Sequence, residues 1–233
     1  MIRIGLVSIA LFFACSIQAS TLARTTAEFP EVPAPPSGEA QWVAKSMRLN
    51  GLPMTLKSFH SRMNPDAVLH YYDSWSKHRG SSASTRSSSM DWQILALKFE
   101  RFFITIQARS SDEGSHGTIA VSPSLSRASV QLETGFPIPA STKIVNLQQY
   151  DDRDAQAEHI SLSSKRPPHI EARAFVQLLG GNGWSVIRQQ RMQDIARGHV
   201  IEAQLGAQQA LLTIFPDRVD GSSTAVIIVW KKS

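Results

Sequence analysis

Cysteine is almost absent from this chain of 233 residues, because Cys15 is the only one. It lies in an N-terminal stretch with the features of a secretory signal, so cleavage after Ala19 would leave a mature protein without cysteine. Disulfide bonds and thiol catalysis would then both be excluded. The mature chain would have to rely on a packed core, for which a hydrophobic content of 42% is sufficient.

Charged residues are also scarce, at 18%, which is low for a cytoplasmic protein and ordinary for an exported one. The formal net charge of +5 permits contact with acidic polymers or anionic membranes without requiring it. Lysine and arginine are scattered along the sequence and form no basic stripe. We therefore expect no nucleic-acid partner.

Long apolar runs are missing as well. No run in the chain approaches the roughly 18 uninterrupted apolar residues that a transmembrane helix needs. Residues 1–19 instead combine Arg3, an apolar stretch from Ile4 to Ala14 and the small-residue site Ile17-Gln18-Ala19. This pattern predicts a signal peptide at residues 1–19 and a periplasmic or secreted mature protein without a transmembrane segment.

An alternative is that Cys15 becomes the lipidated N-terminus of a bacterial lipoprotein. The residues before it, Phe12-Phe13-Ala14, match poorly with the small and aliphatic residues expected there. We therefore favour a cleaved signal peptide in which Cys15 has no role.

Catalytic and ligand-binding patterns are incomplete wherever they occur. Ser141 and Lys143 have Ser-x-Lys spacing, whereas penicillin-binding enzymes need Ser-x-x-Lys to bring the amine over the serine on a helix. Gly180-Gly181-Asn182-Gly183 follows a predicted helix instead of opening one, so it indicates a helix end rather than a phosphate-binding turn.

Histidines and aromatic residues do not change this picture. None of the seven histidines has recognised metal-ligand spacing, and the set comprises His60, His70, His78, His116, His159, His169 and His199. The aromatic stretch Phe99–Ile106 lacks the glycines of an RNA-binding sheet, so we expect it to pack in a core. We predict no catalytic, cofactor-binding or metal residues, and an enzyme is the least favoured function.

The feature that organises the chain is an internal duplication. A strand-like run, a proline, a helix-period segment and a glycine occur twice, and positions 59 and 162, 65 and 168, and 80 and 183 all differ by 103. The sequence therefore predicts an α+β fold of two tandem pseudo-symmetric repeats, residues 41–135 and 136–233. Each repeat contains a β-hairpin, one helix and two to three antiparallel strands.

The two predicted helices begin at Pro65 and Pro168, because proline costs nothing in a first helical turn. Their inward faces follow from the helical spacing of large apolar residues. The two sets are Leu69, Tyr72 and Trp75 in the first helix and Ala172, Phe175 and Leu178 in the second.

Several strand signals surround the helices. Asn50-Gly51 is a strong hairpin turn between Ser46–Leu49 and Leu52–Leu56. A second hairpin is expected from Ile144–Leu147 and Glu158–Leu162. In the first repeat we predict a hairpin of Trp92–Leu97 with Phe102–Ile106 and a mobile loop at Ser81–Ser89 that has no counterpart in the second repeat. In the second repeat, Ala225–Trp230 predicts a central strand covered on both sides.

Residues 20–40 are rich in proline from Glu28 to Gly38 and show no periodicity. They predict an extended tether that makes no core contacts. A docking peptide for a partner is the alternative interpretation.

Export, a tether, duplicated α+β units and the absence of a catalytic set together suggest a class of function. We expect an exported, non-catalytic accessory or assembly protein of the bacterial cell envelope, possibly in a secretion or surface-structure system, whose partner is another envelope protein. The alternative is a small-ligand or glycan-binding protein that uses a cleft between the repeats. The sequence does not indicate the oligomeric state.

Overall fold

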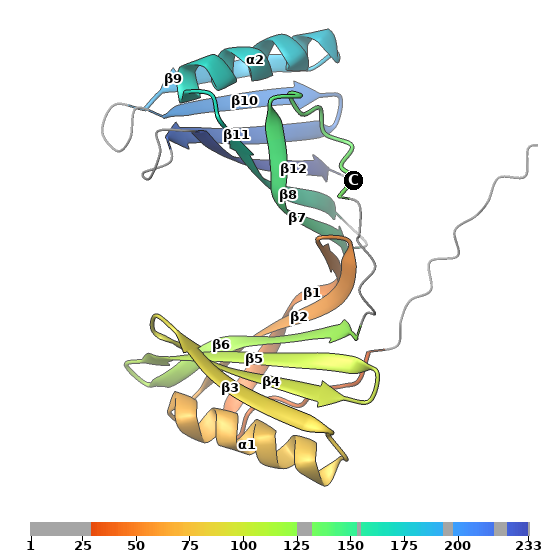
Figure 1. Cartoon of the computed structure of the whole chain (residues 1–233), viewed down its shortest axis with the longest axis vertical. Helices are drawn as coiled ribbons and strands as arrows, with labels where there is room; N and C mark the ends of the chain where they lie inside the picture. Colours follow the sequence, from red (N-terminus) through yellow and green to blue (C-terminus); the bar gives the residue numbers. More distant parts are fainter. Residues whose placement is uncertain (1–28, 125–131, 153–154, 193–197, 217–222, 233) are drawn as a thin grey trace, which may run out of the picture.

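A computed structural model of the chain describes residues 29–124, 132–152, 155–192, 198–216 and 223–232 (Figure 1). These residues form two helices and twelve strands, and all strand pairings are antiparallel. The predicted α+β class is therefore confirmed. The predicted signal peptide, including Cys15, lies outside the described residues.

The first half of the sheet has the strand order β3-β4-β5-β6-β2-β1. Its elements are β1 (Gly38–Leu49), β2 (Leu52–Ser61), α1 (Pro65–His78), β3 (Ala83–Ser89), β4 (Trp92–Phe99), β5 (Phe102–Ser111) and β6 (Gly114–Pro123).

The second half continues the sheet with the order β7-β8-β12-β11-β10-β9. Its elements are β7 (Thr142–Asp152), β8 (Ala155–Ser164), α2 (Pro168–Gly181), β9 (Ser185–Arg191), β10 (His199–Leu205), β11 (Gln208–Pro216) and β12 (Ser223–Lys232). β12 pairs with β8 on one side and β11 on the other, which confirms that Ala225–Trp230 lies in a central strand.

The two halves meet where β1 pairs with β7. Only three register pairs join these strands, Met47–Leu49 against Gln148–Tyr150. The turn residue Asn50 extends the contact, because its backbone N donates to Leu147 O at 2.7 Å and its Oδ1 accepts from Leu147 N at 2.8 Å. In Figure 1 the sheet bends here, and the faces without helices turn toward each other.

Local sequence explains where the elements begin and end. Asn64 caps α1 by accepting a hydrogen bond from Ala67 N at 2.8 Å. Asn50 and Gly51 both have positive φ, 50° and 78°, as the predicted hairpin turn requires. The predicted hairpin of β4 and β5 is also confirmed, and its turn places Glu100 at φ 52°.

Each half has its own hydrophobic core between its helix and its part of the sheet. In the first half the largest fully buried side chains are Phe59, Leu69, Tyr72, Leu95, Leu97, Ile104, Ile106 and Ile119. In the second half they are Leu147, Ile160, Leu162 and Phe175. The two core clusters share no residue among those described.

The predicted inward faces of the helices are largely correct. Leu69 and Tyr72 are fully buried, whereas Trp75 is half-buried at the end of α1. In α2 the residues Ala172 and Phe175 are buried, but Leu179 takes the place predicted for Leu178. Positions 172, 175 and 179 follow the helical repeat more closely than 178 does, because 3.6 residues make one turn.

The predicted mobile loop at Ser81–Ser89 is wrong. Most of it forms β3, which pairs with β4 from Ala83 against Lys98 to Ser89 against Trp92. Every side chain of β3 is exposed, so this edge strand has no alternation of apolar residues that a sequence pattern would show. β9 follows α2 and forms the opposite edge of the sheet.

The tether prediction is wrong for residues 29–37. These residues pack on the first half, and β1 begins at Gly38. Val32 is only 2% exposed and belongs to the first core, and Pro35 is buried. Proline keeps the backbone extended, but an extended segment still has carbonyls and side chains that can bind a neighbouring surface.

Candidate functional site

The N-terminal segment 29–37 is held to the first half by hydrogen bonds to its carbonyls. Tyr72 Oη donates to Pro33 O at 2.8 Å, Lys57 Nζ to Val32 O at 3.0 Å and Ser61 Oγ to Pro36 O at 2.9 Å. Burial, with a smaller effect from neighbouring Tyr71, raises the pKa of the Tyr72 phenol. The phenol therefore stays protonated and remains a donor to Pro33 at physiological pH.

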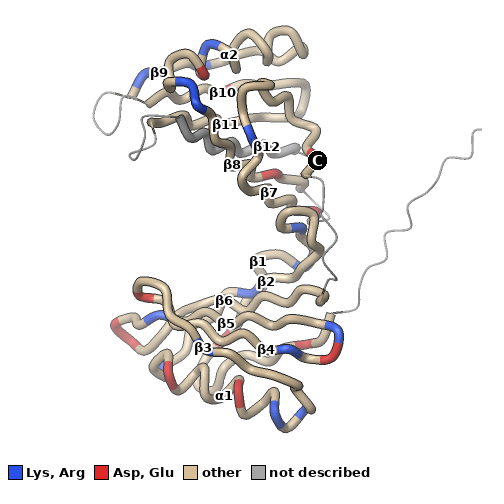
Figure 2. Tube along the Cα trace, viewed as in Figure 1, with Lys and Arg blue, Asp and Glu red and all other residues tan. Residues whose placement is uncertain are grey.

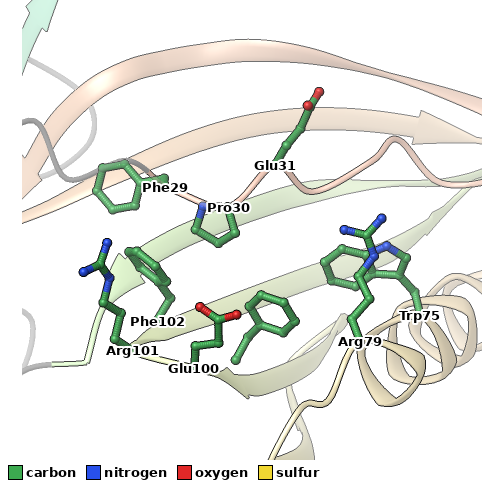
Figure 3. A pocket seen from close by; sticks show the side chains of 9 residues that line it. Phe29, Pro30, Glu31, Trp75, Arg79, Glu100, Arg101 and Phe102 are labelled. Carbon is green, nitrogen blue, oxygen red and sulfur yellow. The ribbon is translucent and has the colours of Figure 1, made fainter.

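This segment forms one wall of a pocket of about 450 Å³ (Figure 3). The second wall is the C-terminal end of α1, with Trp75 and Arg79. The β4–β5 turn, residues 99–102, completes it. The pocket thus depends on three segments that are far apart in the sequence.

Aromatic rings give the pocket its apolar surface. Trp75 stacks on Phe99 with ring centroids 6.0 Å apart and an interplanar angle of 22°. Phe29 lies 5.8 Å from Phe102 in a tilted arrangement. Phe99 and Phe102 are at least 91% buried, so their rings are held by the core before any ligand arrives.

Two arginines lie over these rings. Arg79 Cζ is 5.3 Å from the centroid of Trp75, and Arg101 Cζ is 5.2 Å from that of Phe102. Both are cation–π distances. Glu31 and Glu100 also line the pocket, so the rim carries two positive and two negative groups. In Figure 3 the Glu31 carboxylate points away from the rings.

The pocket lining combines aromatic rings with two arginines and two carboxylates. None of the described lining residues is Ser, Thr, Cys, His or Lys, so the described pocket holds no nucleophile of those types and no histidine base. In the described part of the chain no group of three or more potential metal ligands occurs. The described helices include none long and apolar enough to cross a membrane.

Ser141, part of the Ser-x-Lys pattern, is held in a structural contact. Its Oγ donates to the carboxylate of Glu171 at 3.0 and 3.4 Å, and Ser164 Oγ donates to the same carboxylate at 3.0 Å. Glu171 is completely buried in the first turn of α2. Lys143 is exposed on β7, so no lysine amine is placed over Ser141 by a helix.

The glycine-rich stretch is a helix end, as predicted. α2 ends at Gly181, and Asn182 caps it with its backbone N bonded to carbonyls of the last turn. Gly183 then turns the chain at φ 80°.

The structure brings two pairs of histidines near each other. His60 and His116 have ring centroids 6.1 Å apart on β2 and β6. His199 lies near His169 and Arg191; burial, followed by these two charges, lowers the pKa of its imidazole. His70 and His78 are exposed on α1. His159 Nε2 is buried without a hydrogen-bond partner among the described residues.

The aromatic stretch Phe99–Ile106 packs mainly in the core, as predicted. Phe99, Phe102, Ile104 and Ile106 are buried, whereas Phe103 is 42% exposed. Lysine and arginine of the described residues are scattered over both halves (Figure 2).

Sequence reasoning did not find the pocket. Its lining comes from a segment predicted as a tether, a helix end and a turn, and only their packing joins them. The clearest sequence signal of the pocket was Glu100-Arg101 between Phe99 and Phe102. A charged turn flanked by aromatic residues places rings and charges together at one end of a hairpin.

Comparisons of the chain with protein-family models, curated protein sequences and solved structures give no match.

Proposed function

We propose that this chain is an exported, non-catalytic interaction protein of the bacterial cell envelope that holds another envelope protein at the pocket beside α1. The observation that carries this proposal is the combination of fixed aromatic rings with Arg79 and Arg101 over them. Tryptophan and arginine are enriched among the residues that dominate binding energy in protein interfaces.

The rings favour binding because they are ordered in advance. Trp75 is stacked on Phe99, and Phe102 is buried beneath Phe29, so little side-chain entropy remains to be lost when a partner binds. The two guanidinium groups are positioned by the same rings, and a guanidinium can pair with a carboxylate in a bidentate manner. The partner expected here presents an apolar side chain next to an acidic one.

We also infer that the two halves are repeats of one unit. Both follow the element order hairpin, helix and four strands. Ser61 Oγ and Ser164 Oγ each accept from the backbone N two residues later at 3.1 Å, and Gly80 and Gly183 have φ of 82° and 80° after the helices. These positions differ by the same 103 residues. The boundaries 41–135 and 136–233 stay a prediction.

Duplication allows one copy to serve as the control for the other. The α2 end carries Asn182 where the α1 end carries Arg79. The corresponding position in the second half therefore lacks the arginine that lies over Trp75. A protein partner that recognises the pocket should distinguish these two sites.

Site-specific photo-crosslinking in living cells tests the proposal. A photoreactive residue at Glu31 should give one dominant protein adduct in the envelope fraction, and the same residue at Asn182 should not. The double substitution Arg79→Gln with Arg101→Gln should abolish the adduct, whereas Arg173→Gln on the exposed side of α2 should leave it unchanged.

Two results would contradict the proposal. Adducts of equal yield at positions 31 and 182 would show that envelope proteins contact the chain without distinguishing the pocket from the corresponding site of the second half. An adduct that survives the double substitution in a stably folded protein would show that the arginines take no part.

A further inference from the structure

A second group of side chains forms a row across four neighbouring strands of the first half. His60 on β2 lies opposite His116 on β6, and His116 lies opposite Arg109 on β5. Trp92 on β4 completes the row beside Arg109. We call these four residues the cross-strand row.

The cross-strand row lies on the face of the sheet away from α1. Phe59, Ala108 and Gly117, its neighbours in sequence, are buried on the α1 side. Successive strand residues point to opposite faces, so the row points the other way. In Figure 1 this face turns toward the second half. It is therefore separate from the pocket beside α1.

Arg109 is the best-positioned charge of the row. Its Cζ lies 4.8 Å from the centroid of the Trp92 ring, and its Nε donates to His116 Nε2 at 2.5 Å. Trp92 in turn meets His116 edge-on at 5.9 Å. Among the described residues no carboxylate forms an ion pair with Arg109. The guanidinium is thus fixed in place while its outer Nη edge remains available to an anion.

The contact with Arg109 also defines the state of His116. Arginine Nε carries a hydrogen and can only donate, so His116 Nε2 accepts and the imidazole is neutral. Burial, followed by the charges of Arg109 and His60, lowers the pKa of His116, which agrees with a neutral ring. A metal ion at His116 would have to displace a cation from this nitrogen, which argues against a metal site.

Polar side chains flank the row on the same face. Ser58 on β2, Thr118 on β6 and Gln107 on β5 are register partners of one another, and each lies two residues from a member of the row on its own strand. Their hydroxyl and amide groups both donate and accept hydrogen bonds. Strands are about 4.8 Å apart, so the row spans roughly 14 Å from β4 to β2. This length and these groups suit a short stretch of a linear saccharide.

We propose that the cross-strand row binds an anionic saccharide chain. Arg109 holds a sulfate, phosphate or carboxylate group of the saccharide, the Trp92 ring packs on the apolar face of a sugar, and the flanking hydroxyl and amide groups bind sugar hydroxyls. A single-stranded nucleic acid fits less well, because its backbone needs a positively charged groove and the row has one permanently charged group, Arg109.

On this face, β4 and β5 carry two basic side chains, Lys98 and Arg109. Glu39 lies opposite His60 at the far end of the row, and Lys98 lies on the same face of β4. Asp91, Asp112 and Glu113 belong to turns at the ends of the strands. The proposal does not depend on the proposed protein partner, since the pocket arginines lie on the other side of the sheet.

Calorimetric titration with dextran sulfate at one fixed salt concentration tests the proposal, with neutral dextran and oligothymidylate as comparison ligands. We expect dextran sulfate to bind and neutral dextran to bind far more weakly. Arg109→Gln and Trp92→Ala should each weaken dextran sulfate binding by about tenfold, the effect of losing a charge-assisted or stacking contact. Thermal melts should show that both variants remain folded.

Arg173→Gln is the matched control, because Arg173 is an exposed arginine on α2 that belongs to neither proposed site. It should change dextran sulfate binding by less than about twofold, since one exposed charge contributes little by itself. Equal losses of dextran sulfate binding in Arg173→Gln and Arg109→Gln would show that net charge alone causes the binding, and would overturn the proposal. Oligothymidylate binding with the same dependence on Trp92 and Arg109, or neutral dextran binding as tightly as the sulfate, would overturn it as well.

Discussion

At the scale of single residues, burial separates aromatic side chains that form the core from the aromatic side chain that lines the pocket. Phe175 of α2 and Tyr72 of α1 are both fully buried. Trp75, one turn further along α1, is half-buried and lines the pocket. Helical spacing predicts that Phe175, Tyr72 and Trp75 all face the core. It does not predict at which residue the core ends, because the extent of the core depends on the length of the strands that face each helix.

Phe175→Ala should strongly destabilise the protein. Removing a large buried ring leaves a cavity, and the expected loss is about 3–5 kcal/mol of unfolding free energy. Phe103→Ala is the control, because Phe103 is 42% exposed on the other half, and its loss should stay below about 1 kcal/mol. Urea unfolding followed by circular dichroism measures both. Similar losses in the two variants would contradict the assignment of Phe175 to the core.

At the scale of elements, the N-terminal segment is a structural part of the first half. Its carbonyls accept hydrogen bonds from Tyr72, Lys57 and Ser61, and Val32 fills the core. A proline-rich sequence without periodicity gives no sign of this. The partners of the segment lie 25 and 39 residues away along the chain, so only the folded structure brings them together.

A chain that begins at Gly38 should therefore be less stable than one that begins at Phe29. The shorter chain loses the burial of Val32 and four hydrogen bonds, the three named above and the one from Arg62 N to Ser37 O, each contributing about 1 kcal/mol. It also exposes the Tyr72 hydroxyl and the Phe102 ring. The expected result is a clearly lower melting temperature for the shorter chain, measured by differential scanning calorimetry. Equal melting temperatures would restore the interpretation of residues 29–37 as a simple tether.

At the scale of the whole molecule, two separate cores share one continuous sheet. The link between them is three register pairs long and ends at Asn50. A small third cluster, Ala44, Met47 and Met54 with Tyr150 packed against it, supports the link. Local stability follows local packing, so this junction should open more easily than either core.

Asn50→Gly tests this expectation, because glycine keeps the positive φ of the turn but removes the Oδ1 that accepts from Leu147 N. Hydrogen exchange should show about tenfold faster exchange of the Leu147 amide, the effect of losing about one hydrogen bond. Amides in β5 and β11 should keep their protection. Glu100→Gly is the control, since Glu100 has φ 52° in a turn within one half. Equal deprotection of both cores by Asn50→Gly would show that the halves unfold as one unit.

The sequence by itself determined the elements whose signals are local. Asn50-Gly51 predicted a turn, Pro65 and Pro168 predicted helix starts, and Gly80 and Gly183 predicted the turns that follow the helices. These residues act through their own backbone preferences, which hold wherever the chain places them. The alternation of apolar residues in β4 and β5 likewise predicted a hairpin with one buried face.

Only the tertiary structure decided the edge strand β3, the packing of residues 29–37 and both proposed binding surfaces. β3 is exposed along its whole length, so no burial pattern selects its residues. Arg109 meets Trp92 and His116 because of strand register, and a shift of one residue would turn these side chains to the opposite face. The short turns between β4, β5 and β6 fix the register of these three strands, whereas β2, which brings in His60, pairs with β6 from a distant part of the sequence. The arrangement of side chains in both proposed sites therefore follows from strand pairing and packing, which the residue pattern alone does not show.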